Sequence, residues 1–221
     1  MSSVKQRKIE QPFRFLDLIP EIRNMVYEQL LPPRRVLRPW SGRVIRKHKM
    51  KLVWGGEVAP LTSLLRANRQ LNAEVAPVVY GANTFELKAC ASTIHWLKDI
   101  GSMKKLIRHV EMDIDCSTTV TGNLHQLKQA EGLQTFSIPS VPWDRYARAD
   151  GHSSGGMAHM FGPFVKNLYK ARKDANTKED IIQIIRAAPF TEWQKINRAG
   201  RNKELKAYVE GLREALKEIL S

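Results

Sequence analysis

Short strand-like and helix-like segments alternate through the middle of the chain, and this alternation limits the possible folds most strongly. Residues 83–87, 107–114 and 133–138 show the short, alternating patterns of strands, whereas residues 92–100 and 124–130 carry apolar residues at helical spacing. Strands separated by helices favour crossover connections, in which successive strands lie parallel. The pattern therefore predicts a small curved sheet of about three short parallel strands.

Helical patterns flank this part of the chain on both sides. A helix is expected to begin at Pro20 and to end before Pro32, and further helices are expected over residues 62–68, 71–81, 161–172, 178–188 and from about residue 192 onward. The resulting fold class is α+β and mostly helical. The alternation of strands and helices weakly resembles a leucine-rich-repeat solenoid, but the spacing between successive strands is too irregular for such a repeat.

The composition of successive segments predicts how the chain is organised. Residues 139–159 are rich in Pro, Gly and Ser and predict a long loop. The expected parts are a disordered basic N-terminus (1–12), a helical region (13–82) with a basic insert (32–56), a small α/β part (83–138), that loop, and a helical C-terminal region (160–221).

An apolar seam runs along the last predicted helix. Its members alternate at spacings of four and three residues: Leu205, Val209, Leu212, Leu216 and Ile219. The seam extends over about two heptads, fewer than the three or four that indicate an independent coiled coil. We therefore expect it to pack on the core of its own domain in a monomeric protein, with dimerisation as the alternative.

Composition excludes several classes of protein. With 43% hydrophobic and 26% charged residues among 221, the chain is expected to bury a core rather than remain disordered. Cys90 and Cys116 are too few for a disulfide framework, and no segment approaches a membrane span or a secretion signal. These features predict a soluble protein of the nucleus or cytoplasm.

The basic residues are concentrated in one stretch of the sequence. The formal net charge is +14, and the stretch between residues 34 and 51 contains no acidic residue. Its basic residues are Arg34, Arg35, Arg38, Arg43, Arg46, Lys47, Lys49 and Lys51. Because Trp40 lies within the stretch and Trp54 follows it, the stretch is a candidate for binding phosphates and stacking on bases of a nucleic acid. A solvated loop or a nuclear import signal is the alternative.

Motifs for catalysis or metal binding are weak. Ser153 lies in a glycine-x-serine-x-glycine pattern, but the buried strand that a hydrolase nucleophile needs before it is missing from the sequence. The histidines show no metal-ligand spacing with the cysteines. Glu111, Asp113 and Asp115 alternate along a predicted strand and indicate an exposed polar face or a salt-bridging partner for the basic insert. We therefore expect no enzyme, no cofactor and no metal.

Two blocks of the sequence resemble the F-box-like proteins that are expanded in filamentous fungi. The first block, residues 18–31, contains the leucine-x-proline-glutamate-isoleucine opening of the first F-box helix. The second block, residues 64–74 and 77–85, resembles the second and third helices of the family and the start of its first strand. With Arg108 and His109, the similarity covers roughly residues 13–115.

The resemblance implies a non-enzymatic interaction module, a substrate-recruiting subunit of a cullin-type ubiquitin ligase. Its first helix would dock into a Skp-type adaptor, and the rest of the chain would contact an unknown target protein. The implied adaptor contacts are Leu18, Ile19, Pro20, Ile22, Met25, Val26 and Leu30. The same apolar stripe suits either a groove on a helical partner or the core of this protein, and the sequence leaves both open.

Overall fold

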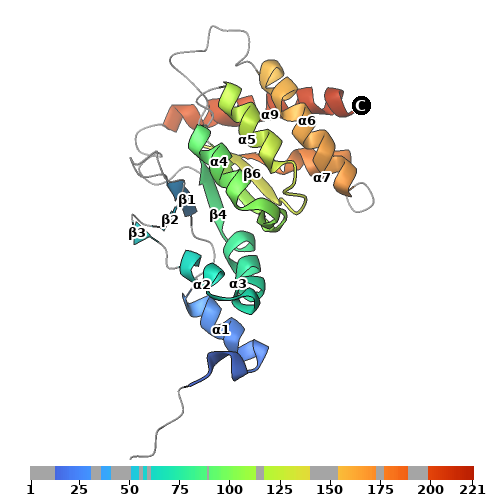
Figure 1. Cartoon of the computed structure of the whole chain (residues 1–221). Coiled ribbons are helices and arrows are strands. Elements are labelled where there is room, and N and C mark those ends of the chain that lie inside the picture. The colour runs from blue at the N-terminus through green and yellow to red at the C-terminus, as the bar shows by residue number, and fades with distance from the viewer. Residues whose placement is uncertain are drawn as a thin grey trace, which may run out of the picture.

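The computed structural model describes residues 13–30, 36–40, 51–54, 57–58, 61–88, 90–112, 117–139, 154–172, 177–188 and 199–221. It confirms an α+β fold that is mostly helical (Figure 1). Within these residues, no helix combines the length and the hydropathy that a membrane span requires.

The sheet contains more strands than the sequence predicts. Strands β4 (Thr84–Leu87), β5 (His109–Met112), β6 (Thr135–Ile138) and β7 (Ile185–Ala187) form a parallel unit, and β1 (Val36–Trp40) pairs parallel with β4. Strands β2 (Lys51–Trp54) and β3 (Glu57–Val58) extend the sheet beyond β1 with antiparallel pairing. The spatial order is β3-β2-β1-β4-β5-β6-β7.

Two of the parallel strands correct the expected count of about three. β1 lies in the basic insert, where the sequence predicts no strand. Its first two residues pair with β4, and Leu37 is buried opposite Phe85. β7 falls within the predicted helix 178–188, which ends at Gln183. A short apolar run is compatible with a helix or a buried strand, so periodicity alone does not separate the two.

The described helices precede, connect and follow the strands of this sheet. In chain order they are α1 (Pro20–Leu30), α2 (Leu61–Ala67), α3 (Arg69–Gly81), α4 (Ala91–Asp99), α5 (Ser117–Leu127), α6 (Ser154–Arg172), α7 (Lys178–Gln183) and α9 (Ala199–Leu220). Two 3-10 helices, η1 (Phe15–Asp17) and η2 (Gly101–Leu106), precede α1 and β5. α4 ends at Asp99, and Gly101 shortly after it, at the start of η2, has a φ of 54° that favours glycine.

Two helix boundaries differ from the sequence prediction. α6 begins at Ser154, so the predicted loop 139–159 ends earlier than expected, and α5 begins at Ser117 rather than near residue 124. Gly155 and Gly156 are poor helix formers, but Met157 and Ala158 immediately after them are buried in the core. Tertiary packing therefore outweighs local propensity at this end of α6.

The helices α4, α5, α6 and α9 follow one another as contacting neighbours alongside the sheet (Figure 1). From β4 to β7 the strand order follows the chain order, which places right-handed crossover helices on one face. The side chains of Phe85, Val110 and Phe136 stand in register and are buried in the core. The intervening positions carry half-buried polar side chains: Thr84, Glu86, His109, Glu111, Thr135 and Ser137.

The C-terminal helix packs on its own domain, as the sequence predicts. Leu205, Val209, Leu212 and Leu216 are buried in the common core, and α9 contacts α6, α7 and β7. Arg213 of α9 also donates a hydrogen bond to the Ile185 carbonyl of β7, at 2.9 Å. α9 therefore belongs to the core and also contacts the edge strand of the sheet.

Candidate functional site

Helix α1 lies at one end of the molecule, where it packs against α3 (Figure 1). As the sequence predicts, it begins at Pro20, whose fixed φ suits the first turn of a helix. The face turned toward α3 is formed by Arg23 and Tyr27, which are one turn apart and only 5% and 1% exposed.

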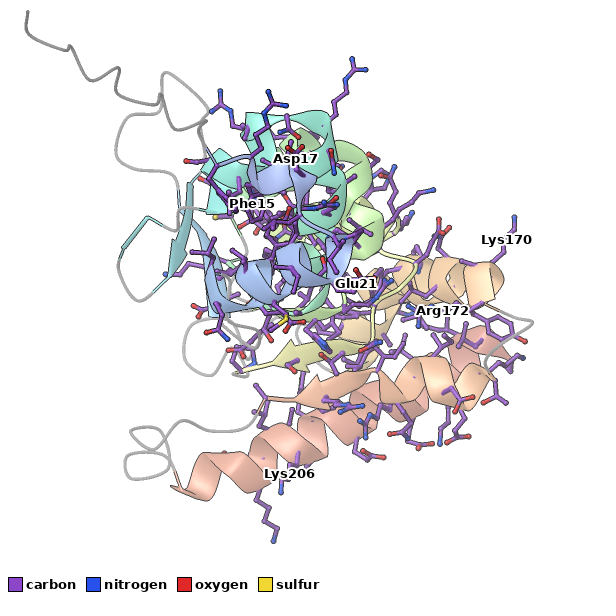
Figure 2. All side chains as sticks on the ribbon, turned by 90° about the horizontal axis from the view of Figure 1, so that it is seen from below. Phe15, Asp17, Glu21, Lys170, Arg172 and Lys206 are labelled. Carbon is purple, nitrogen blue, oxygen red and sulfur yellow. The ribbon has the colours of Figure 1, made fainter. Side chains whose placement is uncertain are left out.

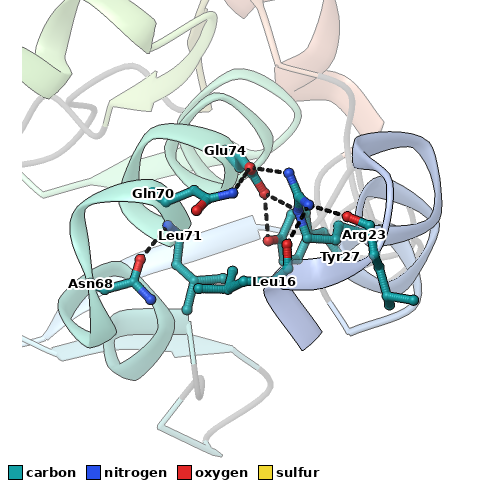
Figure 3. Close-up of polar contacts among 8 residues, drawn as sticks. Leu16, Arg23, Tyr27, Asn68, Gln70, Leu71 and Glu74 are labelled. Atoms are coloured by element: carbon teal, nitrogen blue, oxygen red, sulfur yellow. Dashed lines mark hydrogen bonds and ion pairs between the residues drawn. The ribbon is translucent and has the colours of Figure 1, made fainter. Parts of the chain in front are cut away.

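A polar network fixes α1 to α3 (Figure 3). The Arg23 guanidinium pairs with both carboxylate oxygens of Glu74, at 2.9 Å from Nε and 2.7 Å from Nη2. The Tyr27 hydroxyl donates to the same carboxylate at 2.7 Å, and the Gln70 amide donates to it at 3.1 Å. A bidentate guanidinium–carboxylate contact constrains the relative orientation of its two side chains in addition to pairing their charges. This network therefore fixes the orientation in which α1 packs against α3.

The same arginine holds the turn that precedes α1. Its Nη1 donates to the carbonyl of Leu16 at 3.1 Å and to the carbonyl of Leu18. The ring of Phe15 packs edge-on against Tyr27, with centroids 5.7 Å apart. The η1 turn and α1 are therefore held in a fixed relation to each other.

The charges of the network shift the pKa values of its members. Hydrogen bonds from Arg23, Tyr27 and Gln70 hold the pKa of Glu74 at about 2, against an ordinary value of 4.5. Burial, followed by the contact with Glu74, raises the pKa of Tyr27 to about 12. The hydrogen bond to Glu74 also raises the pKa of Arg23. The carboxylate and the guanidinium are therefore both charged over the whole physiological range.

In contrast to Arg23 and Tyr27, the large apolar side chains of α1 and of the segment just before it are exposed to solvent. Met25 is 61% exposed, Ile19 60% and Ile22 41%, and Leu30 is also exposed. Leu16 and Phe13, on the segment before α1, are exposed as well. We call these six residues the α1 apolar surface. The helix is therefore anchored by polar side chains and presents apolar ones, the reverse of an ordinary surface helix.

Of the seven residues implied as adaptor contacts, Ile19, Pro20, Ile22, Met25 and Leu30 are exposed, and Leu18 and Val26 are half-buried. Sequence reasoning missed Arg23, Tyr27 and Glu74, which anchor the surface. The spacing of Arg23 and Tyr27 was visible in the sequence, but their partner lies 51 residues from Arg23.

The basic candidates lie largely outside the described part of the chain. Arg34, Arg35, Arg43, Arg46, Lys47 and Lys49 are outside the described residues. Arg38 lies on β1 opposite Val53, and Lys51 lies on β2 opposite Trp40. The part of the insert that is described therefore includes paired strands.

Most of the remaining sequence candidates lie outside the described part of the chain. Ser153, Asp113 and Asp115 are outside the described residues, and Glu111 is half-buried on β5. Nδ1 of His109 lies 2.9 Å from the Thr135 hydroxyl, and burial lowers its pKa, helped by the charges of Arg108 and Arg186. Over the ranges that the structure covers, no group of three His, Cys, Asp or Glu side chains is arranged to hold a metal ion.

Comparison with known proteins gives no match to a family model, to a curated protein or to a solved structure.

Proposed function

We propose that the α1 apolar surface docks into a groove on a Skp-type adaptor, and that the chain is a non-enzymatic, substrate-recruiting subunit of a cullin-type ubiquitin ligase. One observation carries the proposal: α1 is fixed to the body by Arg23 and Tyr27 and leaves its large apolar side chains exposed. Large exposed apolar patches mark interaction surfaces in soluble proteins.

The energetics favour a protein partner for this surface. A Met, Ile or Leu side chain contributes about 1.5–3 kcal/mol when a partner removes it fully from water. Met25, Ile19 and Leu30 are each more than half exposed, so most of that free energy is still available for binding. An amphipathic helix presented in this way matches helix-in-groove recognition.

Preorganisation supports the same interpretation. Arg23 ties the η1 turn and α1 to Glu74, so the surface does not have to be ordered when a partner arrives. Association loses less free energy when the contacting segment already has its bound conformation. The location of α1 at the end of the molecule opposite α9 leaves the rest of the body available for a target (Figure 1).

The experiment is co-purification of the full chain with a Skp-type adaptor and cullin from a filamentous fungus. The Ile22→Asp and Met25→Asp variants are expected to abolish the complex because each buries an unpaired charge in the interface. Asn24→Asp is the matched control, since Asn24 is an exposed polar residue of the same helix. Failure of the folded wild-type chain to form a complex at micromolar concentration refutes the proposal.

Polyanion binding is the second candidate function. It is supported by the net charge of +14 and by the eight basic residues between positions 34 and 51. This function uses different residues from the α1 apolar surface, so the two candidates are tested separately.

A further inference from the structure

Two arginines contact the same turn at the end of the sheet where the strands begin. Arg172, the last residue of α6, donates Nε to the Glu131 carbonyl and Nη2 to the Leu133 carbonyl, the latter at 2.8 Å. Arg108, directly before β5, donates Nη1 to the Lys105 carbonyl at 3.0 Å. Figure 2 shows Arg172 where α6 ends.

Gly132, in the middle of this turn, brings the two side chains together. A Cβ atom on Gly132 would overlap Nη1 and Cζ of Arg108, so the guanidinium lies directly against the glycine backbone. Arg172 meanwhile binds the carbonyls on both sides of Gly132. Arg172 is thus hydrogen-bonded to the segment 131–133, and the Arg108 guanidinium lies against the middle of the same segment while it donates to the Lys105 carbonyl.

The two arginines of this pair have no salt-bridge partner in the described part of the chain. Half-burial lowers the pKa of Arg172, and the neighbouring charge of Arg108 lowers it further, whereas Glu131 acts in the opposite direction. Two like charges held together in this way favour an anion beside them.

Donor groups remain for such an anion. Each guanidinium has five N–H donors, and the backbone contacts use one nitrogen of Arg108 and two of Arg172. Hydrogen bonds to backbone carbonyls restrain both guanidinium groups, and both residues are half-buried, so the remaining donors are still partly accessible. Fixed, forked donors of this kind suit planar or tetrahedral oxyanions.

We propose that Arg108 and Arg172 together bind a phosphate monoester. A monoester carries a charge of about −1.5 to −2 and three acceptor oxygens, which match two guanidinium groups better than the single charge of a carboxylate or a phosphodiester. The ligand is a free monoester or a phosphorylated side chain of a partner. This site is independent of the α1 apolar surface and of adaptor docking.

The test is calorimetric titration of the full chain with inorganic phosphate, phenyl phosphate, a short phosphoserine peptide with its unphosphorylated form, and dimethyl phosphate. We expect saturable binding of the monoesters and much weaker binding of dimethyl phosphate. Tighter binding of the phosphoserine peptide than of phenyl phosphate identifies a protein ligand, and the reverse identifies a free monoester.

Three variants and one control locate the site. Arg108→Gln and Arg172→Gln are each expected to weaken monoester binding by about tenfold or more, because each removes charged hydrogen bonds. Gly132→Ala retains both arginines and displaces only the flexible end of Arg108, so it is expected to weaken binding without unfolding the protein. Arg66→Gln, which removes an exposed arginine of α2, is expected to have no effect.

The proposal is overturned if the wild-type chain binds no monoester saturably. It is also overturned if Arg108→Gln and Gly132→Ala, both folded by circular dichroism, bind phenyl phosphate as wild type does. Equal weakening by Arg66→Gln assigns any binding to the overall positive charge rather than to this pair. Arg172→Gln also removes the two hydrogen bonds that hold the turn at Gly132. If the Arg172→Gln protein fails to fold, the Arg108→Gln and Gly132→Ala variants decide the result.

Discussion

Removal of helix α9 is expected to destabilise the protein strongly. Leu212 and Leu216 are fully buried, and Leu205, Val209 and Leu220 are buried as well. At about 1.5–3 kcal/mol for each buried side chain, their combined contribution is comparable with the entire stability of a domain, about 5–15 kcal/mol. Truncation after Asn202 is therefore expected to unfold the protein, and Leu212→Ala alone is expected to cost about 2–5 kcal/mol.

Thermal melting together with light scattering measures both effects. Lys206→Ala is the matched control, because Lys206 extends into solvent from the same helix (Figure 2) and is expected to leave the melting temperature within about 1 °C of wild type. A truncated chain that melts cooperatively at the wild-type temperature refutes the assignment of α9 to the core. If the truncated chain stays folded and a wild-type dimer becomes a monomer, the seam is an oligomer interface instead.

Two further predictions concern charge. The pKa of Glu74 is lowered to about 2, so its network stabilises the fold above the ordinary carboxyl pKa and loses this effect as the pH falls from about 4.5 to about 2. The difference in melting temperature between wild type and Glu74→Gln is expected to shrink over that pH range. A difference that stays constant contradicts the assignment. If the basic insert binds nucleic acid, affinity falls steeply with salt concentration, and glutamine substitutions are expected to flatten that slope. The substituted residues are Arg43, Arg46, Lys47 and Lys49, and a filter-binding assay at several salt concentrations with RNA and duplex DNA measures the slope.

The sequence predicts those parts of the fold whose pattern is complete within a short segment. Strands β4, β5 and β6 alternate clearly, and α1 is bounded by prolines, so these elements were predictable. β7 was not, because Ile184 and Ile185 suit the end of a helix as well as a strand. Its identity depends on pairing with β6, which lies far away in the sequence.

The candidate site shows the same division between local and long-range information. Periodicity predicts that Ile19, Ile22 and Met25 share a stripe, but it does not tell whether a core or a partner covers them. Whether the stripe is buried or exposed depends on Glu74 of α3. Arg23 and Tyr27 form hydrogen bonds with Glu74, so their face of α1 packs against α3 and the apolar stripe remains exposed. The anchoring of the stripe is a tertiary property, so the sequence left its exposure open.

The most direct test of adaptor docking is the affinity of the purified full chain for a purified Skp-type adaptor, measured by titration calorimetry for wild type and for the Ile22→Asp/Met25→Asp double variant. Both residues are well exposed, so the variant is expected to melt like wild type. The account predicts micromolar or tighter binding for wild type and at least a tenfold weaker affinity for the folded double variant. Absence of binding, or equal affinity of the two proteins, contradicts it.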